Sequence, residues 1–168
     1  MALFSRRTDP PMLTHYRQHT GRQEQMLAWA QGPRVELLAF LTHFAVRYAE
    51  GEWQLIGWHH VRSGGWRAEG EELHWRLADG SKENFHLTEV GDFPGVFRDR
   101  VQASIVVEDR FEPPTGGLVL LTARRDLAEE HPRLDWHVEA IRGASLQDPQ
   151  TKRLAELALA RLRADYDF

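Results

Sequence analysis

The hydrophobic pattern changes its period once along the chain, and this change restricts the fold more than any other feature of the sequence. From about residue 23 to residue 88, short runs of branched and aromatic residues alternate with turn residues, as in a series of short β-strands. Phe93, Phe97, Val101 and Ile105 then recur every four residues, which is the spacing of one face of an α-helix. Short strands followed by a helix predict an α+β fold.

The individual elements follow from these periods and from the turn residues between them. Strands are predicted over residues 23–30, 35–42, 44–50, 52–58, 64–70, 72–78, 82–88, 117–123 and 134–141. A helix is predicted to begin at residue 93, with Asp92 as its N-cap and Pro94 in its first turn, and to end near residue 107. Its end stays open, because Ile105-Val106-Val107 also suits a strand. A second helix is predicted to begin at Asp148-Pro149.

One predicted hairpin, ELHWRLADGSKENFHLTE, shows what the alternation determines. Apolar residues alternate with polar ones on both strands, so apolar residues of one strand must lie opposite apolar residues of the other. A three-residue loop, DGS, satisfies this condition and places Trp75 opposite Phe85 and His74 opposite His86. The two-residue Asp-Gly turn that turn preferences favour would place Leu73 opposite His86. The burial pattern predicts the first register, with Trp75 in the core.

These elements predict a flexible N-terminal arm over residues 1–22 and a single α+β domain over residues 23–168. Residues 23–110 are expected to form a mostly antiparallel barrel or bent sheet followed by the helix that begins near Phe93. Residues 111–168 are expected to add a β-hairpin and a C-terminal helix.

The composition excludes several classes of protein. The chain has 168 residues, a formal net charge of −4 and no cysteine. Disulfides, thiolate metal sites and cysteine nucleophiles are therefore excluded, and the interspersed charges predict no nucleic-acid partner. The start, MALFSRRTDPP, has no apolar export region, and the longest apolar runs are too short to span a bilayer. We therefore expect a cytoplasmic protein without a membrane span.

Known catalytic motifs do not occur, so no catalytic residue and no cofactor is predicted. The nine histidines offer a metal site as an alternative hypothesis. If His74 faces His86, their Cβ atoms would lie about 5 Å apart, and His59 or His60 could supply a third ligand. The competing interpretation places these histidines on the solvent-exposed face of a β-sheet, without a metal.

The run WQLIGWHHVRSGGW, over residues 53–66, contains three tryptophans and is the main candidate for a ligand site. Trp58 and Trp66 could form an aromatic platform. Arg62 and Arg76 could hold an anionic group, and Arg67 could join them in binding an anionic membrane headgroup. The competing interpretation places the tryptophans in the core, and the net negative charge weighs against the headgroup.

Six stretches carry a resemblance to a known family: LAWA (27–30), WQLIGWHHVRSGGW (53–66), FRDRVQASIVVEDR (97–110), GGLVLLTARR (116–125), LDWHVEA (134–140) and DPQTKRLAELALARLRA (148–164). From residue 25 onward the chain resembles a family of uncharacterised actinobacterial proteins, which implies no assigned activity. The strand IGWHHV, the two bent sheets and the helix after them are similar to a bacterial pleckstrin-homology-like barrel. That resemblance implies a helix that plugs the barrel, and residues 111–168 depart from it.

The main functional expectation is a small non-catalytic binding or scaffolding module for a protein or a small ligand. It depends mainly on the lack of a catalytic constellation, so the protein is not expected to be an enzyme. A histidine metal site and an anionic-headgroup site are the two alternatives. Leu154, Leu157 and Leu162 of the C-terminal helix could leave apolar surface for a homodimer.

Overall fold

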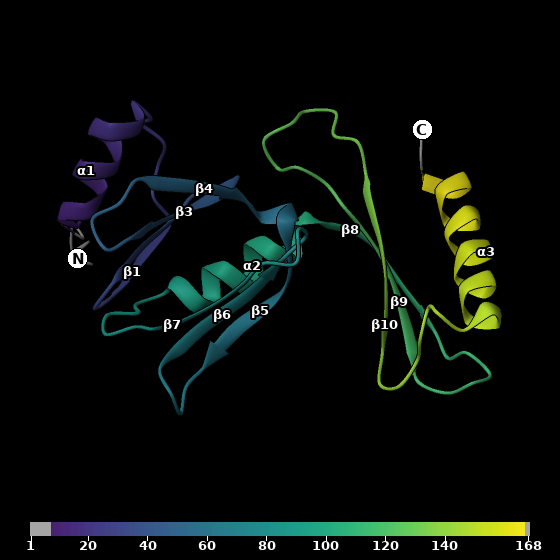
Figure 1. Cartoon of the computed structure of the whole chain (residues 1–168). Helices are drawn as coiled ribbons and strands as arrows, with labels where there is room; N and C mark the ends of the chain where they lie inside the picture. The colour runs from purple at the N-terminus through teal and green to yellow at the C-terminus, as the bar shows by residue number, and fades with distance from the viewer. Residues whose placement is uncertain (1–7, 167–168) are drawn as a thin grey trace, which may run out of the picture. The chain divides into compact units, whose positions relative to one another are not determined.

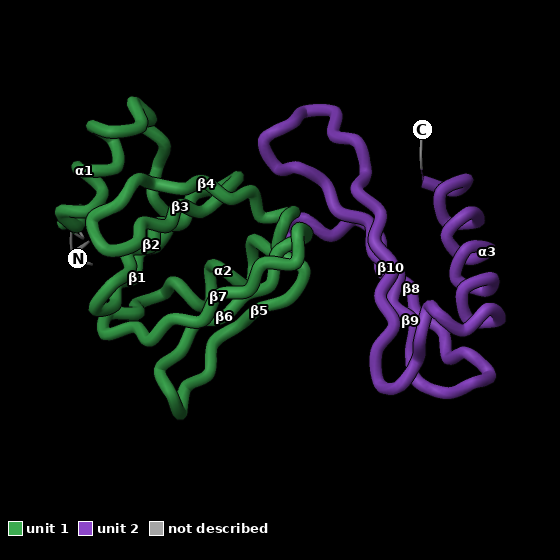
Figure 2. The backbone as a smooth tube through the Cα atoms, viewed as in Figure 1, with its two compact units in different colours: residues 1–101 green, residues 102–168 purple. Residues whose placement is uncertain are grey.

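The computed structural model describes residues 8–166, which form three α-helices and ten β-strands. The strands make three separate sheets, and neighbouring strands in each sheet are antiparallel. These elements confirm the predicted α+β class. The chain divides into two compact units, one that ends at Val101 and one that begins at Gln102 (Figure 2). None of the helices in the described part of the chain is long and apolar enough to cross a bilayer.

The first sheet of unit 1 is a four-stranded meander that carries a helix (Figure 1). Its elements are α1 (Pro11–Thr20), β1 (Ala28–Gly32), β2 (Val35–Ala39), β3 (His43–Tyr48) and β4 (Trp53–Gly57), with the strands in the order β1-β2-β3-β4. Met12, Leu13 and Tyr16 of α1 are buried in one cluster with residues of this sheet. The predicted flexible arm over residues 1–22 is therefore wrong for α1, whose apolar face belongs to the core. The rest of that prediction, residues 1–7, lies outside the described residues.

The second sheet of unit 1 follows directly and is covered by a helix. Its elements are the 3₁₀-helix η1 (Trp58–His60), β5 (Val61–Arg67), β6 (Glu72–Leu77), β7 (Lys82–His86) and α2 (Phe93–Ser104), with the strands in the order β5-β6-β7. Phe93 and Phe97 of α2 are buried. The ring of Phe97 lies 5.7 Å from those of Phe44 and Trp58 and 6.1 Å from that of Trp75. The helix thus packs against residues of both sheets, as its four-residue spacing predicts.

In the described part of the chain, backbone pairing does not close the two sheets of unit 1 into a barrel. They meet at one isolated bridge between Gln31 of β1 and Glu89, which follows β7. There Gln31 N donates to Glu89 O at 2.9 Å, and Thr88 N donates to Gln31 O at 2.8 Å. Unit 1 therefore has two sheets linked at one corner, with an aromatic core that α2 completes.

The β6–β7 hairpin has the predicted faces and a different register. Trp75 is buried, as predicted. However, it lies opposite Glu83 rather than opposite Phe85. Ser81 donates its N–H and its hydroxyl to the Asp79 carboxylate, at 2.9 and 2.6 Å, and so helps to hold the loop. A shift of two residues leaves every side chain on its own face, so the burial pattern could not distinguish the two registers.

Unit 2 is a three-stranded sheet with a long helix on one face (Figure 1). Its elements are β8 (Ile105–Phe111), β9 (Leu118–Arg124), β10 (Asp135–Ile141) and α3 (Pro149–Tyr166), with the strands in the order β10-β9-β8. Val119 and Leu121 of β9 are buried in one cluster with Ala155 of α3. The Asp148 carboxylate accepts from the N–H and the hydroxyl of Thr151, both at 2.8 Å, and caps the helix.

Two predictions near this unit need correction. Helix α2 ends at Ser104 rather than near residue 107, because the β-branched run that begins at Ile105 forms β8. The predicted pair of strands is present as β9 and β10, which are antiparallel, and β8 pairs with the other edge of β9 as a third strand. The division of the chain accordingly falls after Val101 and not at the predicted boundary between residues 110 and 111.

Candidate functional site

The outer face of the second sheet, opposite the buried Leu73 and Trp75, carries nine positions in a regular array. The pairing of β6 with β5 and β7 arranges these positions in three rows across the strands. The rows are Ser63–Arg76–Lys82, Gly65–His74–Asn84 and Arg67–Glu72–His86. Alternate residues of a strand point to the same side of a sheet, so the side chains of this array share the face that points away from the core.

The first row, which we call the cationic row, places two cations side by side. Arg76 and Lys82 are direct cross-strand partners, and like charges in such positions destabilise a sheet. Arg76 Nε lies 3.5 Å from Ser63 Oγ. Lys82 makes no ion pair within the described part of the chain. An anion bound between the two cations would remove their repulsion, so the row has the chemistry of an anion site.

The row at the other end of the array is electrically compensated. Arg67 NH1 lies 3.8 Å from Glu72 Oε2. On the neighbouring strand, His86 Nε2 lies 3.9 Å from Glu71 Oε2, and His86 Nδ1 lies 3.1 Å from the backbone oxygen of Gly70. The Arg67 charge in this row therefore has a carboxylate beside it.

The middle row is uncharged when His74 is neutral. Gly65 adds no side chain to the face, and a Cβ atom there would meet only His74 Cε1, at 3.8 Å. Nδ1 of the half-buried His74 is itself buried and has no hydrogen-bond partner in the described part of the chain. Asn84 Nδ2 lies 3.4 Å from Glu72 Oε2. At the Gly65 position of the middle row, no side chain covers the sheet.

A cavity of about 430 Å³, which we call the basic cavity, lies at this array. It is lined by Ser63, Arg67, His74, Trp75, Arg76, Lys82, Glu83 and Asn84. Three of these residues are cations and one is a carboxylate. That carboxylate, Glu83, lies in register with Trp75 on the inner face, where burial and Glu83 raise the pKa of Tyr48 to about 12. The cavity is therefore lined by more cations than carboxylates, within a chain whose net charge is −4.

Of the four predicted ligand-binding residues, only Arg76 lines the basic cavity. Trp58 is fully buried, and its Nε1 donates to a backbone oxygen at 3.0 Å, so it belongs to the core and cannot serve as a platform. Trp66 is half-buried and pairs with Leu73 on the inner face. Arg62 lies at the register shift of β5 and outside the array. Arg67, predicted as part of a headgroup site, lines the cavity.

The predicted metal ligands are not brought together. His74 lies opposite Asn84 rather than opposite His86, so the geometry on which the metal hypothesis was based is wrong. His59 and His60 belong to η1, and their rings lie 4.0 Å apart. In the described part of the chain, no three histidine, aspartate or glutamate side chains are placed to hold a metal ion.

Sequence reasoning missed Ser63, Lys82 and Asn84 as site residues. The signal was present, because Lys82 and Asn84 alternate with Phe85 in the same way as the polar residues of the strand before them. Their place beside Arg76 and His74 depends on the hairpin register, which the alternation does not determine.

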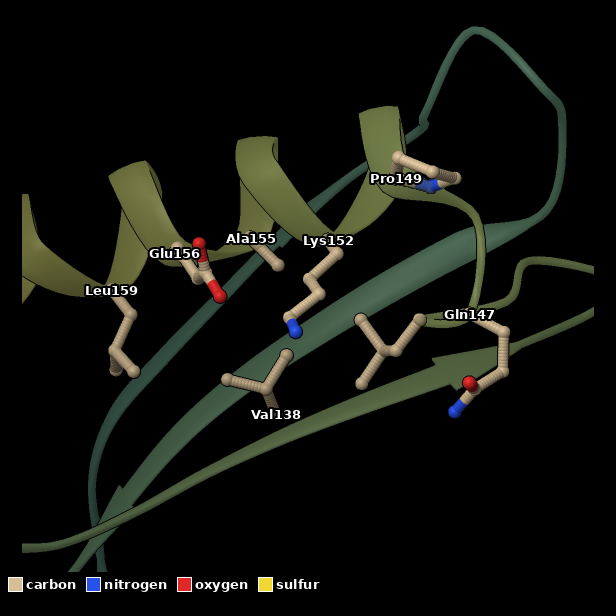
Figure 3. A pocket seen from close by; sticks show the side chains of 8 residues that line it. Val138, Gln147, Pro149, Lys152, Ala155, Glu156 and Leu159 are labelled. Carbon is tan, nitrogen blue, oxygen red and sulfur yellow. The ribbon is translucent and has the colours of Figure 1, made fainter.

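A second hollow, the α3–β10 groove, has a different chemistry (Figure 3). Its volume is about 570 Å³, and its lining residues are mainly apolar, such as Val138 and Leu159. The side chains of Lys152 and Glu156 extend from α3 toward the sheet (Figure 3). One cation and one anion on the same wall give the groove no preference for ligand charge, in contrast to the basic cavity.

A polar network lies under α1 in unit 1. Tyr16 Oη lies 3.2 Å from His43 Nε2 and 3.2 Å from Glu24 Oε2, and Arg22 NH1 donates to Glu24 Oε1 at 2.6 Å. Burial lowers the pKa of His43 and raises the pKa of Tyr16 to about 12. Tyr16 and His43 are both buried, so we interpret this network as structural.

The chain matches no protein-family model, no curated protein and no solved structure. The function is therefore inferred from the geometry and the chemistry of the site.

Proposed function

We propose that this protein is a small non-catalytic binding module and that the basic cavity binds the anionic group of a small molecule. The observation that carries the proposal is the cationic row, in which Arg76 and Lys82 are direct cross-strand neighbours. Like charges directly opposite each other on neighbouring strands are generally destabilising. Natural sequences keep unfavourable local pairings of this kind mainly at functional sites. An anion bound between Arg76 and Lys82 would make a charge-assisted hydrogen bond with each of them.

Hydrogen-bond donors around the row support the same ligand class. The hydroxyl of Ser63 and the amide of Asn84 line the cavity together with the cations. Phosphate and carboxylate groups offer several acceptor oxygens, which suits a site with donors on more than one side. The volume of about 430 Å³ falls in the range of roughly 300–1,000 Å³ typical of small-molecule sites.

The resemblance of unit 1 to a pleckstrin-homology-like barrel is also part of this proposal. It is supported by the succession of four strands, three strands and a helix in unit 1. It carries no information about the ligand, because one fold can host unrelated functions.

Calorimetric titration of the protein with inorganic phosphate tests the proposal. We expect saturable binding that weakens with added salt, and a loss of about tenfold or more in affinity in the double variant Arg76→Gln/Lys82→Gln. The matched control, Arg98→Gln/Arg153→Gln, removes the same charge from two exposed positions elsewhere and should bind as the unmodified protein does. Equal losses in both variants would mean that only net charge matters, and the proposal would be wrong.

Vesicles that contain phosphatidic acid provide a second arm. A soluble anion as ligand predicts binding of free phosphate without binding of the vesicles. Binding of the vesicles that the cationic-row variant abolishes would assign the same chemistry to a membrane headgroup.

A further inference from the structure

The basic cavity is larger than an isolated anion requires. A phosphate ion has five heavy atoms, whereas the cavity has a volume of about 430 Å³, in the range of sites for whole small molecules. The cationic row lies along one side of the array, and the middle row lies next to it. A ligand anchored at the cationic row would therefore place the rest of its structure over the middle row.

Gly65 adds no side chain beside His74. Its position faces His74 across the strands, and a Cβ atom there would meet His74 Cε1 at 3.8 Å and nothing else within 4 Å. Any residue with a longer side chain would extend over the imidazole. The glycine is not required by the backbone, because it has no positive φ.

The ring of the half-buried His74 differs in its contacts from those of several other histidines in the structure. The rings of His15 and His19 stack on each other, and that of His43 stacks on Phe40. His74 makes no ring contact and no hydrogen bond in the described part of the chain, and its Nδ1 is buried. A ligand group over the middle row would gain an imidazole ring for contact.

We propose that the ligand of the basic cavity is an anionic group attached to a flat unsaturated ring, with the anion at the cationic row and the ring over Gly65 and His74. This inference rests on the proposed anion-binding function. Flat rings pack on the face or edge of another ring at little cost in conformational freedom. Asn84 lies at the end of the same row and can hydrogen-bond a polar substituent of the ring.

Two ligands of equal charge test this assignment. Phenyl phosphate and methyl phosphate share the anionic group and differ in the ring, so the ratio of their dissociation constants isolates the ring. We expect phenyl phosphate to bind the unmodified protein about tenfold more tightly than methyl phosphate. Gly65→Val, whose side chain would extend over the His74 ring, should bring the ratio of the two dissociation constants close to one.

His74→Ala is a second variant with a different physical basis. It removes the ring beneath the ligand without filling the cavity, and it should also reduce the preference for phenyl phosphate. Thermal unfolding and circular dichroism establish that each variant is folded. Equal affinities of the two phosphates for the unmodified protein would overturn the ring assignment and leave anion binding intact. If neither phosphate binds, both the ring assignment and the proposed function are wrong.

Discussion

The two adjacent glycines of β5 are predicted to respond in opposite ways to the same substitution. An alanine Cβ at position 64 would lie 2.6 Å from the backbone oxygen of His74 and 3.1 Å from both Trp75 Cα and Phe97 Cε1. Optimal contact between carbon atoms requires roughly 3.5–4.0 Å. Two of these three atoms belong to the backbone of β6, which cannot move without disturbing the pairing of the sheet. Gly64→Ala should therefore cost about 1–3 kcal/mol, as overpacked cores do.

Gly65→Ala is the matched control, because its Cβ points to the open outer face. The nearest atom would be His74 Cε1, at an ordinary 3.8 Å. Without a clash, the alanine restricts the unfolded chain and should leave the protein equally stable or stabilise it by up to about 1 kcal/mol. Urea unfolding followed by tryptophan fluorescence measures both variants. Equal midpoints for Gly64→Ala and Gly65→Ala would refute the packing of α2 and β6 against β5.

Three further predictions concern the core, the buried network and the last helix. Phe97→Ala should lower the free energy of unfolding by about 3–5 kcal/mol, because the residue is only 2% exposed. The control Leu157→Ala, at a residue that is 60% exposed, should change that free energy by less than about 0.5 kcal/mol. Similar losses of stability in the two variants would contradict the assigned core. Burial lowers the pKa of His43 in the folded protein, so the unfolded chain binds a proton more readily, and the free energy of unfolding should fall as the pH drops below about 6.5, the pKa of histidine in the unfolded chain. His43→Gln should flatten this pH dependence in unfolding curves measured at several pH values, and an unchanged slope would exclude His43 as its source. Asp148→Ala should lower the helix content and thermal stability of unit 2, measured by circular dichroism, because it removes both bonds from Thr151, whereas an unchanged melting curve would show that this cap is dispensable.

The sequence was sufficient for the class of fold and for much of the core. Period-two alternation predicts that Trp75 is buried, and period-four spacing predicts that Phe93 and Phe97 lie on the buried face of a helix. All three are confirmed, because burial of an apolar face is a strong, local constraint that leaves a pattern in the sequence. The same spacing extended to Ile105 was misleading, since a β-branched residue directly after the helix starts a strand instead.

The arrangement of the site could not be predicted in the same way. The cationic row exists only in the register that pairs Arg76 with Lys82, and a slip of two residues would preserve every face while separating the two cations. Trp58 is a candidate binding residue from its place in a tryptophan-rich run, but it lies in η1 and its ring is buried in the core. Site residues that meet across strands depend on pairings that no single stretch of the chain determines.

The central claim is that the outer face of the β5–β7 sheet binds an anion at the cationic row, and ¹H–¹⁵N chemical-shift mapping with inorganic phosphate tests it most directly. The account predicts saturable shifts that are largest at the backbone amides of Ser63, Gly65, Arg76, Lys82 and Asn84. It is contradicted if these amides do not shift with saturation, or if the largest shifts occur along the α3–β10 groove.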